Sequence, residues 1–279
     1  MRIALVQHVA GLDRNRNVDR GLEALSEAAA SGAEVVVYPE LAFTRFHPQC
    51  RLEGNRLDLA EPIPGPTTTR FSQEAARLGI VVVLNLYERS GDRAFDSSPV
   101  IDADGALLGT TRMMHITQYE GFYEQDYYDP GDTGAPVYDT AKGRLGVAIC
   151  YDRHYPEYMR ALALDGADLV VIPQAGAVGE WPAGVFEAEL QAASFQNGYF
   201  IALANRVGQE ELLRFAGGSL VVDATGCVVA RAPEHEECIL YADVDAATAA
   251  ASPARQLFLR HRRPEIYTEG ALRPLADAP

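Results

Sequence analysis

Short apolar runs alternate with helix-like segments along most of the chain, and this alternation limits the possible folds more than any other feature. Residues 2–7 and 34–38 have the pattern of buried strands, and residues 18–30 between them have the Ala, Leu and Glu content of a helix. Continuous apolar strands are typical of sheets that are covered on both faces. The sequence therefore predicts a layered α/β fold.

The same order continues through the rest of the chain. The sequence predicts helices at 67–78, 156–164 and 187–197, and strands at 80–87, 168–173 and 199–205. Two similar segments, 100–109 and 221–230, carry an Asp-x-x-Gly turn between apolar runs, which predicts two hairpins. The similarity of these two segments indicates that each half of the chain contributes one sheet, unless the similarity is a coincidence. Cys227, directly after a turn glycine, is expected near the surface.

The composition excludes several classes of function. Nucleic-acid binding needs clustered Lys and Arg, so the net charge of -15 excludes a nucleic-acid partner. No run approaches the roughly 20 apolar residues that cross a bilayer, and the N-terminus lacks the features of a signal peptide. The four cysteines form no CxxC pair, so no zinc site or disulfide framework is expected. These features predict a cytoplasmic protein with reduced thiols and no membrane partner.

Cys150 ends the apolar run 145–150 and precedes a predicted helix start at Pro156 and Glu157. A nucleophile is often presented at such a position, because the strand end holds the sulfur rigidly and the N–H groups of a helix start favour a thiolate. The alternative is an ordinary core cysteine, since free Cys is among the most buried residue types.

Glu40 lies just beyond the strand at 34–38, in the run Tyr38-Pro-Glu40-Leu41. A carboxylate at this position is costly to bury without a task or a partner. Either it caps a helix or pairs with an arginine, or it serves Cys150 as a general base whose pKa rises toward neutrality. In the second case it removes the thiol proton and later activates water.

These segments, in this order and spacing, resemble the nitrilase superfamily of carbon-nitrogen hydrolases over nearly the whole chain. Tyr38-Pro-Glu40-Leu41 is similar to the element that carries the family's catalytic glutamate, and residues 146–157 are similar to the element that carries its nucleophile. Residues 122–132, with Glu124, resemble the segment of its second glutamate, and residues 262–267 resemble its C-terminal arm. The resemblance is strongest to N-carbamoyl amino acid amidohydrolases and β-ureidopropionase-like members.

The resemblance implies a four-layer α-β-β-α sandwich in one domain, residues 1–279, with a C-terminal arm from about residue 246. It also implies hydrolysis of a nonpeptide C–N bond in a small-molecule substrate, with no metal or other cofactor, by a homodimer or higher homo-oligomer. In the implied roles Glu40 is base and acid, Cys150 is the nucleophile and Glu124 is an orienting carboxylate. The backbone N–H of Tyr151 is an implied oxyanion donor.

One position departs from the family pattern. The family's lysine belongs to an Arg-Lys-x-His element, whereas this chain reads Arg112-Met113-Met-His115. Loss of one oxyanion donor typically costs about 3 to 4 kcal/mol in transition-state stabilisation. It also removes a positive charge that would lower the pKa of the thiol. Lys142, the only lysine, lies in a predicted exposed turn and is not expected to replace it.

Arg153 and His154 directly follow the nucleophile segment. In the N-carbamoyl amino acid hydrolases that the run resembles, basic residues here bind the substrate carboxylate, and the planar fork of Arg suits that group. The two residues are also candidates to replace the lysine, ahead of His115. Alternatively, Arg153 pairs with Asp152 or Asp165 as part of the scaffold. Trp181, the only tryptophan, either walls the substrate pocket or belongs to the core.

Two hypotheses follow for function. The first is a thiol-dependent hydrolase of a small amide or N-carbamoyl compound that bears a carboxylate. The second is a catalytically silent relative that binds or senses a small molecule, and Met113 is the residue that supports it.

Overall fold

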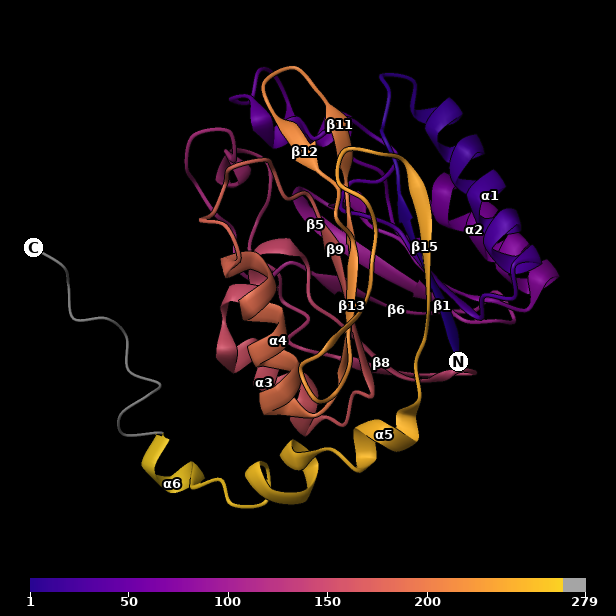
Figure 1. Ribbon diagram of the computed structural model, residues 1–279. Helices are drawn as coiled ribbons and strands as arrows, with labels where there is room; N and C mark the ends of the chain where they lie inside the picture. The colour runs from indigo at the N-terminus through magenta and orange to yellow at the C-terminus, as the bar shows by residue number, and fades with distance from the viewer. Residues whose placement is uncertain (268–279) are drawn as a thin grey trace, which may run out of the picture.

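The computed structural model describes residues 1–267 and shows two β-sheets between two pairs of helices (Figure 1). Residues 268–279, which include the end of the predicted arm, lie outside the described part of the chain. None of the helices in residues 1–267 has the length and apolar character that crossing a membrane requires.

The first sheet has the order β15-β1-β2-β3-β5-β4, with β6 paired to β5, and the second has the order β14-β13-β10-β9-β8-β7. The strands of the first sheet are β1 (Arg2–Gln7), β2 (Val35–Val37), β3 (Val81–Val83), β4 (Leu86–Ser90), β5 (Arg93–Ile101), β6 (Leu107–Arg112) and β15 (Cys238–Asp243). Those of the second are β7 (Val137–Thr140), β8 (Gly143–Val147), β9 (Leu169–Gln174), β10 (Phe200–Asn205), β13 (Leu220–Val222) and β14 (Val228–Arg231). β11 (Val207–Gln209) and β12 (Arg214–Ala216) form a separate ribbon.

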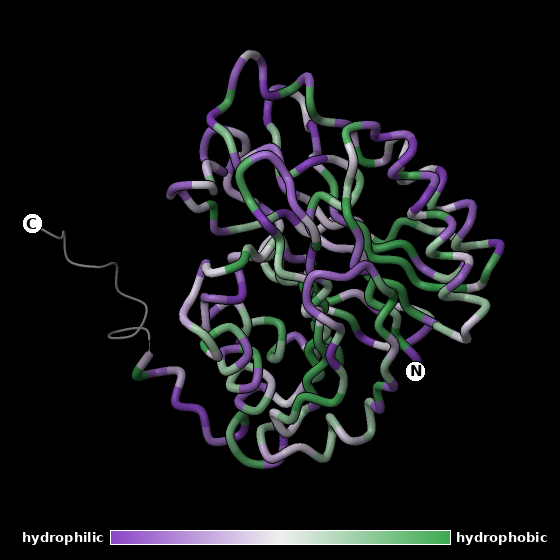
Figure 2. Tube along the Cα trace, turned by 45° about the horizontal axis from the view of Figure 1, so that its top comes forward, coloured by the Kyte–Doolittle hydropathy of each residue, from purple (hydrophilic) through white to green (hydrophobic). Residues whose placement is uncertain are grey.

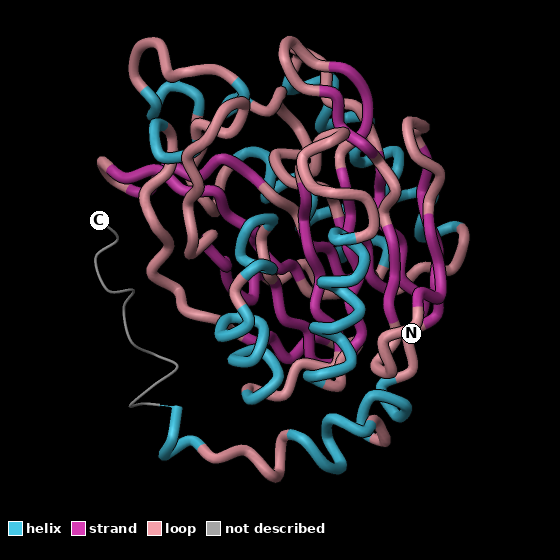
Figure 3. Tube along the Cα trace, turned by 60° about the vertical axis from the view of Figure 1, so that its left-hand side comes forward, coloured by secondary structure: helices cyan, strands magenta, loops and turns pink. Residues whose placement is uncertain are grey.

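The main helices lie in two pairs on the outer sides of the sheets. α1 (Arg14–Ala30) and α2 (Pro66–Leu78) lie side by side on one side in Figure 1, and α3 (Pro156–Leu164) and α4 (Val185–Asn197) lie together on the other. Figure 3 brings the second pair forward, so that its helices stand in front of the strands. The short helices α5 (Ala246–Ala250) and α6 (Pro264–Tyr267) come last along the chain.

Three apolar clusters hold these layers together, because the valine-rich strands bury both of their faces. Val35 and Val37 of β2 pack with strands of the second sheet in a central cluster, whereas Val36 packs toward α1 and α2. A third cluster joins the second sheet to α3 and α4. In Figure 2 the hydrophobic stretches gather on the inner strands. The four-layer α-β-β-α sandwich is therefore confirmed.

The largest difference from the predicted elements is at residues 80–87, where one expected strand is two, β3 and β4. Asn85 separates them, and its side chain accepts a hydrogen bond from the N–H of Leu41 at 2.7 Å and donates to Asp96 at 2.5 Å and Ser98 at 3.1 Å. The pairing with β5 keeps one register on both sides of this gap, since Val83 lies opposite Val100 and Leu86 lies opposite Ser97. The N–H of Leu84 still donates to the carbonyl of Pro99 at 3.2 Å, but Pro99 has no N–H to return a bond. Both predicted hairpins are present, with Gly105 and Gly226 at positive φ.

The predicted assignment of one sheet to each half of the chain is wrong at one strand. β15, near the C-terminal end, pairs antiparallel with β1 and so completes the sheet of the N-terminal half. Beyond it, Arg255 donates to the carbonyl of Gly198 at 2.8 Å and pairs with Asp168 at 2.9 Å. These contacts hold the segment that begins at α5 against its own second sheet.

Candidate active site

Cys150 lies on a sharp turn at the end of the segment that continues β8. Its backbone has φ 41°, a left-handed conformation that costs a non-glycine residue roughly 1 to 2 kcal/mol. It begins a 3-10 turn, Cys150–His154, and α3 starts at Pro156, as predicted, so one short turn separates the thiol from the helix. The side chain is 5% exposed, and the amide of Gln174 donates to its sulfur at 3.2 Å.

The thiol of Cys150 is neutral in this environment. Burial raises its pKa well above the usual value of 9.0, and the charges of Glu40 and Glu124 act in the same direction. The nearby charge of Arg153 opposes them. The raised pKa agrees with the expected effect of losing the lysine charge, and it outweighs the thiolate preference expected from a helix start. The sulfur therefore needs a base before it can react.

Glu40 follows β2 and is fully buried next to that thiol. Its backbone N–H points to the carbonyl of Gln174 at 3.4 Å, which joins the ends of the two sheets at the site. Neither side-chain oxygen of Glu40 has an N–H donor or an arginine partner, so the cap and ion-pair alternatives are wrong. The groups that face it are the Cys150 thiol and the Asp96 carboxyl.

The environment of Glu40 makes it a base near neutral pH. Burial, reinforced by the neighbouring Glu124 carboxyl, raises its pKa to about 8. Hydrogen bonding to Cys150 and Asp96, and the charge of Arg206, act in the opposite direction. The predicted rise toward neutrality is therefore confirmed.

Glu124 is the second buried carboxyl at the site. It begins the 3-10 turn Glu124–Asp126, accepts the backbone N–H of Thr117 at 3.2 Å on one oxygen, and has no hydrogen-bond partner on the other. Burial raises its pKa well above the ordinary value, although the Thr117 bond opposes the shift. Glu124 therefore presents one unpartnered carboxyl oxygen in a buried environment that disfavours its charge.

Met113 directly follows β6 and is fully buried in the central apolar cluster that also contains Cys150. Its backbone is fixed on both sides, since its N–H donates to the carbonyl of Asp96 at 2.9 Å and its carbonyl accepts from Gly131 at 2.8 Å. A thioether thus shares an apolar cluster with Cys150 at the position where the family resemblance implies an ammonium group. Lys142 pairs with Glu34 at 3.3 Å instead.

The three basic residues proposed as substitutes for a lysine are all engaged. His115 contacts Asp152 at 2.7 Å, and His154 contacts Glu189 at 2.6 Å. Arg153 is buried and donates to the carbonyl of Cys150 at 2.9 Å and to Gln174 at 3.1 Å. Its ion-pair partner at 3.3 Å is Glu189, so the expected pairing with Asp152 or Asp165 is wrong.

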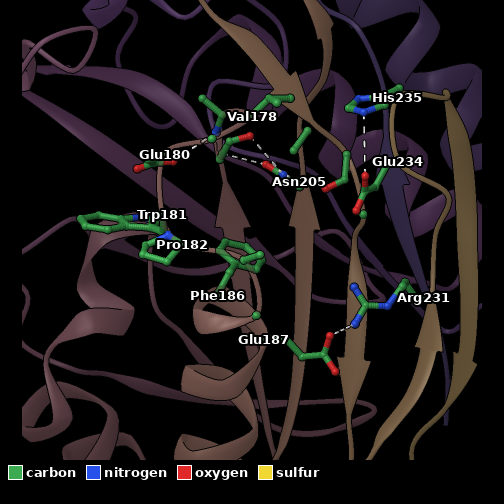
Figure 4. Close-up of a pocket in the computed structure, with 18 residues that line it drawn as sticks. Val178, Glu180, Trp181, Pro182, Phe186, Glu187, Asn205, Arg231, Glu234 and His235 are labelled. Carbon is green, nitrogen blue, oxygen red and sulfur yellow. Dashed lines mark hydrogen bonds and ion pairs between the residues drawn. The ribbon is translucent and has the colours of Figure 1, made fainter.

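Tyr151 and Trp181 lie near His154, with ring centroids 5.0 Å and 5.2 Å from its imidazole. Trp181 is 38% exposed, so the core alternative for it is wrong. It lines a cavity of about 370 Å³ that is bounded by residues 176–187 and, across from them, by Arg231 and His235 (Figure 4). Glu40 and Cys150 are not among the residues that line this cavity.

Sequence reasoning missed Gln174, which ends an apolar strand as Cys150 does and carried the same signal, and it missed Asp96 and Arg206. Arg206 is 1% exposed. Its guanidinium donates to the carbonyls of Glu40 at 2.9 Å and Thr44 at 3.0 Å, and it pairs with Glu210. It therefore fixes the loop that carries the base. No local pattern in the sequence distinguishes Arg206 from the other arginines.

We expect Arg206→Met to lower the free energy of unfolding by about 3 to 5 kcal/mol, because it leaves the buried Glu210 carboxylate without its partner. Chemical denaturation at pH 7 measures the change. Arg231→Met is the matched control: it removes a half-exposed pair with Glu187 and should cost at most about 1 kcal/mol. Equal effects of the two substitutions would contradict the role of Arg206.

Glu40→Gln should stabilise the fold at alkaline pH and not in acid. The pKa of Glu40 is about 8 in the folded chain against a usual value of 4.5, so between these values the unfolded chain releases a proton that the folded chain keeps. The wild type therefore loses stability as pH rises through this window, and glutamine does not. We expect a Tm gain of about 3 °C or more at pH 8.5 that closes toward pH 5. A pH-independent difference would contradict the raised pKa; Glu27→Gln on the exposed side of α1 is the control.

The profile of the carbon-nitrogen hydrolase family matches residues 2–254. The N-carbamoylputrescine amidase of Solanum lycopersicum is 31% identical over 281 residues, covering 95% of this chain and 93% of that protein. A carbon-nitrogen hydrolase from Helicobacter pylori G27 has a TM-score of 0.91 at 29% identity over 99% of both chains. A mutant amidase from Nesterenkonia sp. AN1, with the acetamide moiety of fluoroacetamide added covalently at its active site cysteine, has a TM-score of 0.80 at 28% identity over 97% of this chain and 96% of that one. The chain belongs to the carbon-nitrogen hydrolase family.

Proposed function

We propose that this protein hydrolyses the C–N bond of a small amide or N-carbamoyl compound through an acyl-enzyme on Cys150. The observation that carries the proposal is the pairing of a buried thiol with the buried carboxyl of Glu40, whose pKa of about 8 suits a general base. The covalent adduct on the cysteine of the Nesterenkonia amidase supports the same use of the sulfur.

In this mechanism ionised Glu40 takes the thiol proton while the sulfur of Cys150 attacks the carbonyl carbon. The N–H of Tyr151 stabilises the oxyanion that forms, and Glu124 orients the reacting groups. Protonated Glu40 then gives its proton to the leaving nitrogen, which departs as ammonia. Glu40 finally activates a water molecule, which hydrolyses the thioester and restores the thiol.

For the substrate we favour an N-carbamoyl compound with a carboxylate. Arg153 and His154 each have a buried nitrogen without a hydrogen-bond partner, Nη2 and Nε2, in the turn that starts at the nucleophile. Nη2 of Arg153 is a donor, and Nε2 of His154 becomes one when its imidazole is protonated, since Nδ1 already faces the Glu189 carboxylate. Together the two nitrogens can then bind both oxygens of a carboxylate. The name of the tomato relative refers to an N-carbamoyl compound, which supports the ureido part of the proposal.

Ammonia release at pH 8.5 from N-carbamoyl amino acids, their methyl esters and simple amides tests the proposal. We expect turnover, and a kcat/KM for the free acids at least about tenfold above that for the esters, since esterification removes one charged hydrogen-bonded contact. Equal values for acid and ester would contradict the carboxylate subsite without affecting the hydrolase assignment.

A catalytically silent binding protein is the second candidate function, and the observation that favours it is the buried Met113 in the apolar cluster that contains Cys150. It predicts no ammonia from any compound in the panel, together with a rise in Tm when a compound binds. Turnover of any member of the panel that depends on Cys150 would exclude it.

A further inference from the structure

Asp96 presents a third buried carboxyl to the site, on the side of Glu40. It lies on β5 with no exposed surface. One of its oxygens accepts from the amide of Asn85 at 2.5 Å, and the other has no N–H donor and lies within hydrogen-bonding reach of Glu40. Asn85 in turn holds the N–H of Leu41, the residue after the base. The two carboxyls are thus fixed against each other by one amide.

Two buried carboxyls in contact cannot both be ionised, because each is desolvated and each repels the other. Burial, and then the charge of Glu40, raise the pKa of Asp96 well above its usual value. The other charged groups around the pair are Glu124 and Asp152, which are acidic, and Arg206, whose hydrogen bonds go to carbonyls and Glu210. The Cys150 thiol faces Glu40 as well.

Met113, at the position where the family resemblance implies a lysine, is a neighbour of the Asp96–Glu40 pair. The N–H of Met113 donates to the carbonyl of Asp96, so the two residues are neighbours across the β5 edge. A lysine at 113 would supply positive charge to this group of carboxyls, and methionine supplies none. The charge of Glu40 therefore needs another donor for the base to be ionised near neutral pH.

We propose that Asp96 is a positioning residue that stays protonated and donates a hydrogen bond to Glu40, in the role that a cation at position 113 would otherwise have. The inference rests on the proposed function, in which Glu40 is the base. The proton of Asp96 is not transferred during turnover. The proton of Cys150 goes to Glu40, and the single negative charge moves from the carboxylate to the sulfur. A neutral donor stabilises an anion less than a cation does, which agrees with a base whose pKa remains as high as about 8.

The rate of Cys150 alkylation by iodoacetamide between pH 6 and 10 tests the proposal without a substrate. Peptide mass spectrometry follows Cys150, with the exposed Cys227 as the internal reference. Asp96→Asn keeps a donor toward Glu40 and should leave the pH midpoint within about 0.5 unit of wild type. Asp96→Leu removes the donor and should raise the midpoint by at least about one unit, with roughly tenfold slower labelling at pH 7.

An unchanged midpoint in Asp96→Leu, or an equal shift in Asp96→Asn and Asp96→Leu, would overturn the proposal. Infrared spectroscopy gives a second measurement if the leucine variant does not fold. At pH 7 the wild type should show a protonated-carboxyl C=O band that Asp96→Asn lacks, and identical spectra would overturn the proposal as well. If these results are obtained but no compound releases ammonia, the proposed hydrolase function is wrong, whereas the proposal that Asp96 is protonated and donates to Glu40 is retained.

Discussion

Replacing Cys150 with alanine should abolish ammonia release, with kcat at least about 10⁴-fold lower than in the wild type. The sulfur of Cys150 is the group that forms the acyl-enzyme in the proposed mechanism, and the groups described around it are carboxyls, the guanidinium of Arg153 and the amide of Gln174. The substitution removes one sulfur atom and one hydrogen bond from Gln174, so the fold and substrate binding should persist. A rise in Tm of the alanine variant with the best substrate would show that binding survives without chemistry.

Cys227→Ala is the matched control for this prediction, since Cys227 is exposed on the β13–β14 hairpin and should be dispensable. A steady-state assay of both variants at pH 8.5 makes the comparison where the base is ionised. Turnover that survived Cys150→Ala would rule out the acyl-enzyme and with it the roles given to Glu40 and Tyr151. Loss of turnover in both variants would show general sensitivity to cysteine replacement and would leave the nucleophile unassigned.

The layers of this fold could be predicted from the sequence because they depend on local patterns. Val35, Val36 and Val37 bury both faces of a strand, and a continuous apolar run is what such a strand requires. Boundaries failed where a single side chain decides them. α1 begins at Arg14 because Asp13 caps it, four residues before the predicted start. One expected strand becomes two where Pro99 on β5 has no N–H to pair with Leu84.

The candidate site could be predicted only in part, for a similar reason. Glu40 and Cys150 were identified because polar residues at strand ends are a local signal, and the family resemblance added Glu124. Asp96 gave no such signal, since its position near Glu40 depends on the order of the sheet, in which β3 lies between β2 and β5. The pKa of the thiol could not be predicted from local sequence either: a helix start favours a thiolate, whereas burial and the carboxyls of Glu40 and Glu124, which are far away in the sequence, raise the pKa.

Met113→Lys should raise kcat/KM at pH 7 by about 100-fold or more, because it restores an oxyanion donor of the kind whose loss costs 10²–10³ in rate. The new ammonium group would also lie among Glu40, Asp96 and Glu124. An opposite charge favours the ionised form of a carboxyl, so the pKa of Glu40 should fall and the acid limb of the pH–rate profile should move to lower pH. Measurements of kcat/KM from pH 5 to 10 separate the two effects. An added oxyanion donor raises the maximum value of kcat/KM, whereas an added positive charge moves the acid limb of the pH–rate profile to lower pH.

Two controls isolate the ammonium group in this experiment. Met113→Leu keeps an apolar side chain of similar volume and should behave as the wild type, while Met114→Lys places the same charge on the adjacent residue, which packs toward the third cluster. The direction of the change in kcat/KM distinguishes two interpretations of the site. A gain specific to position 113 would mean that the chain runs the family's mechanism with a weakened oxyanion site. A loss would mean that the protonated Asp96 and the thioether form a working arrangement. A cation would disrupt it by lowering the pKa of Asp96, so that Asp96 loses its proton to solvent and two carboxylates remain beside the sulfur.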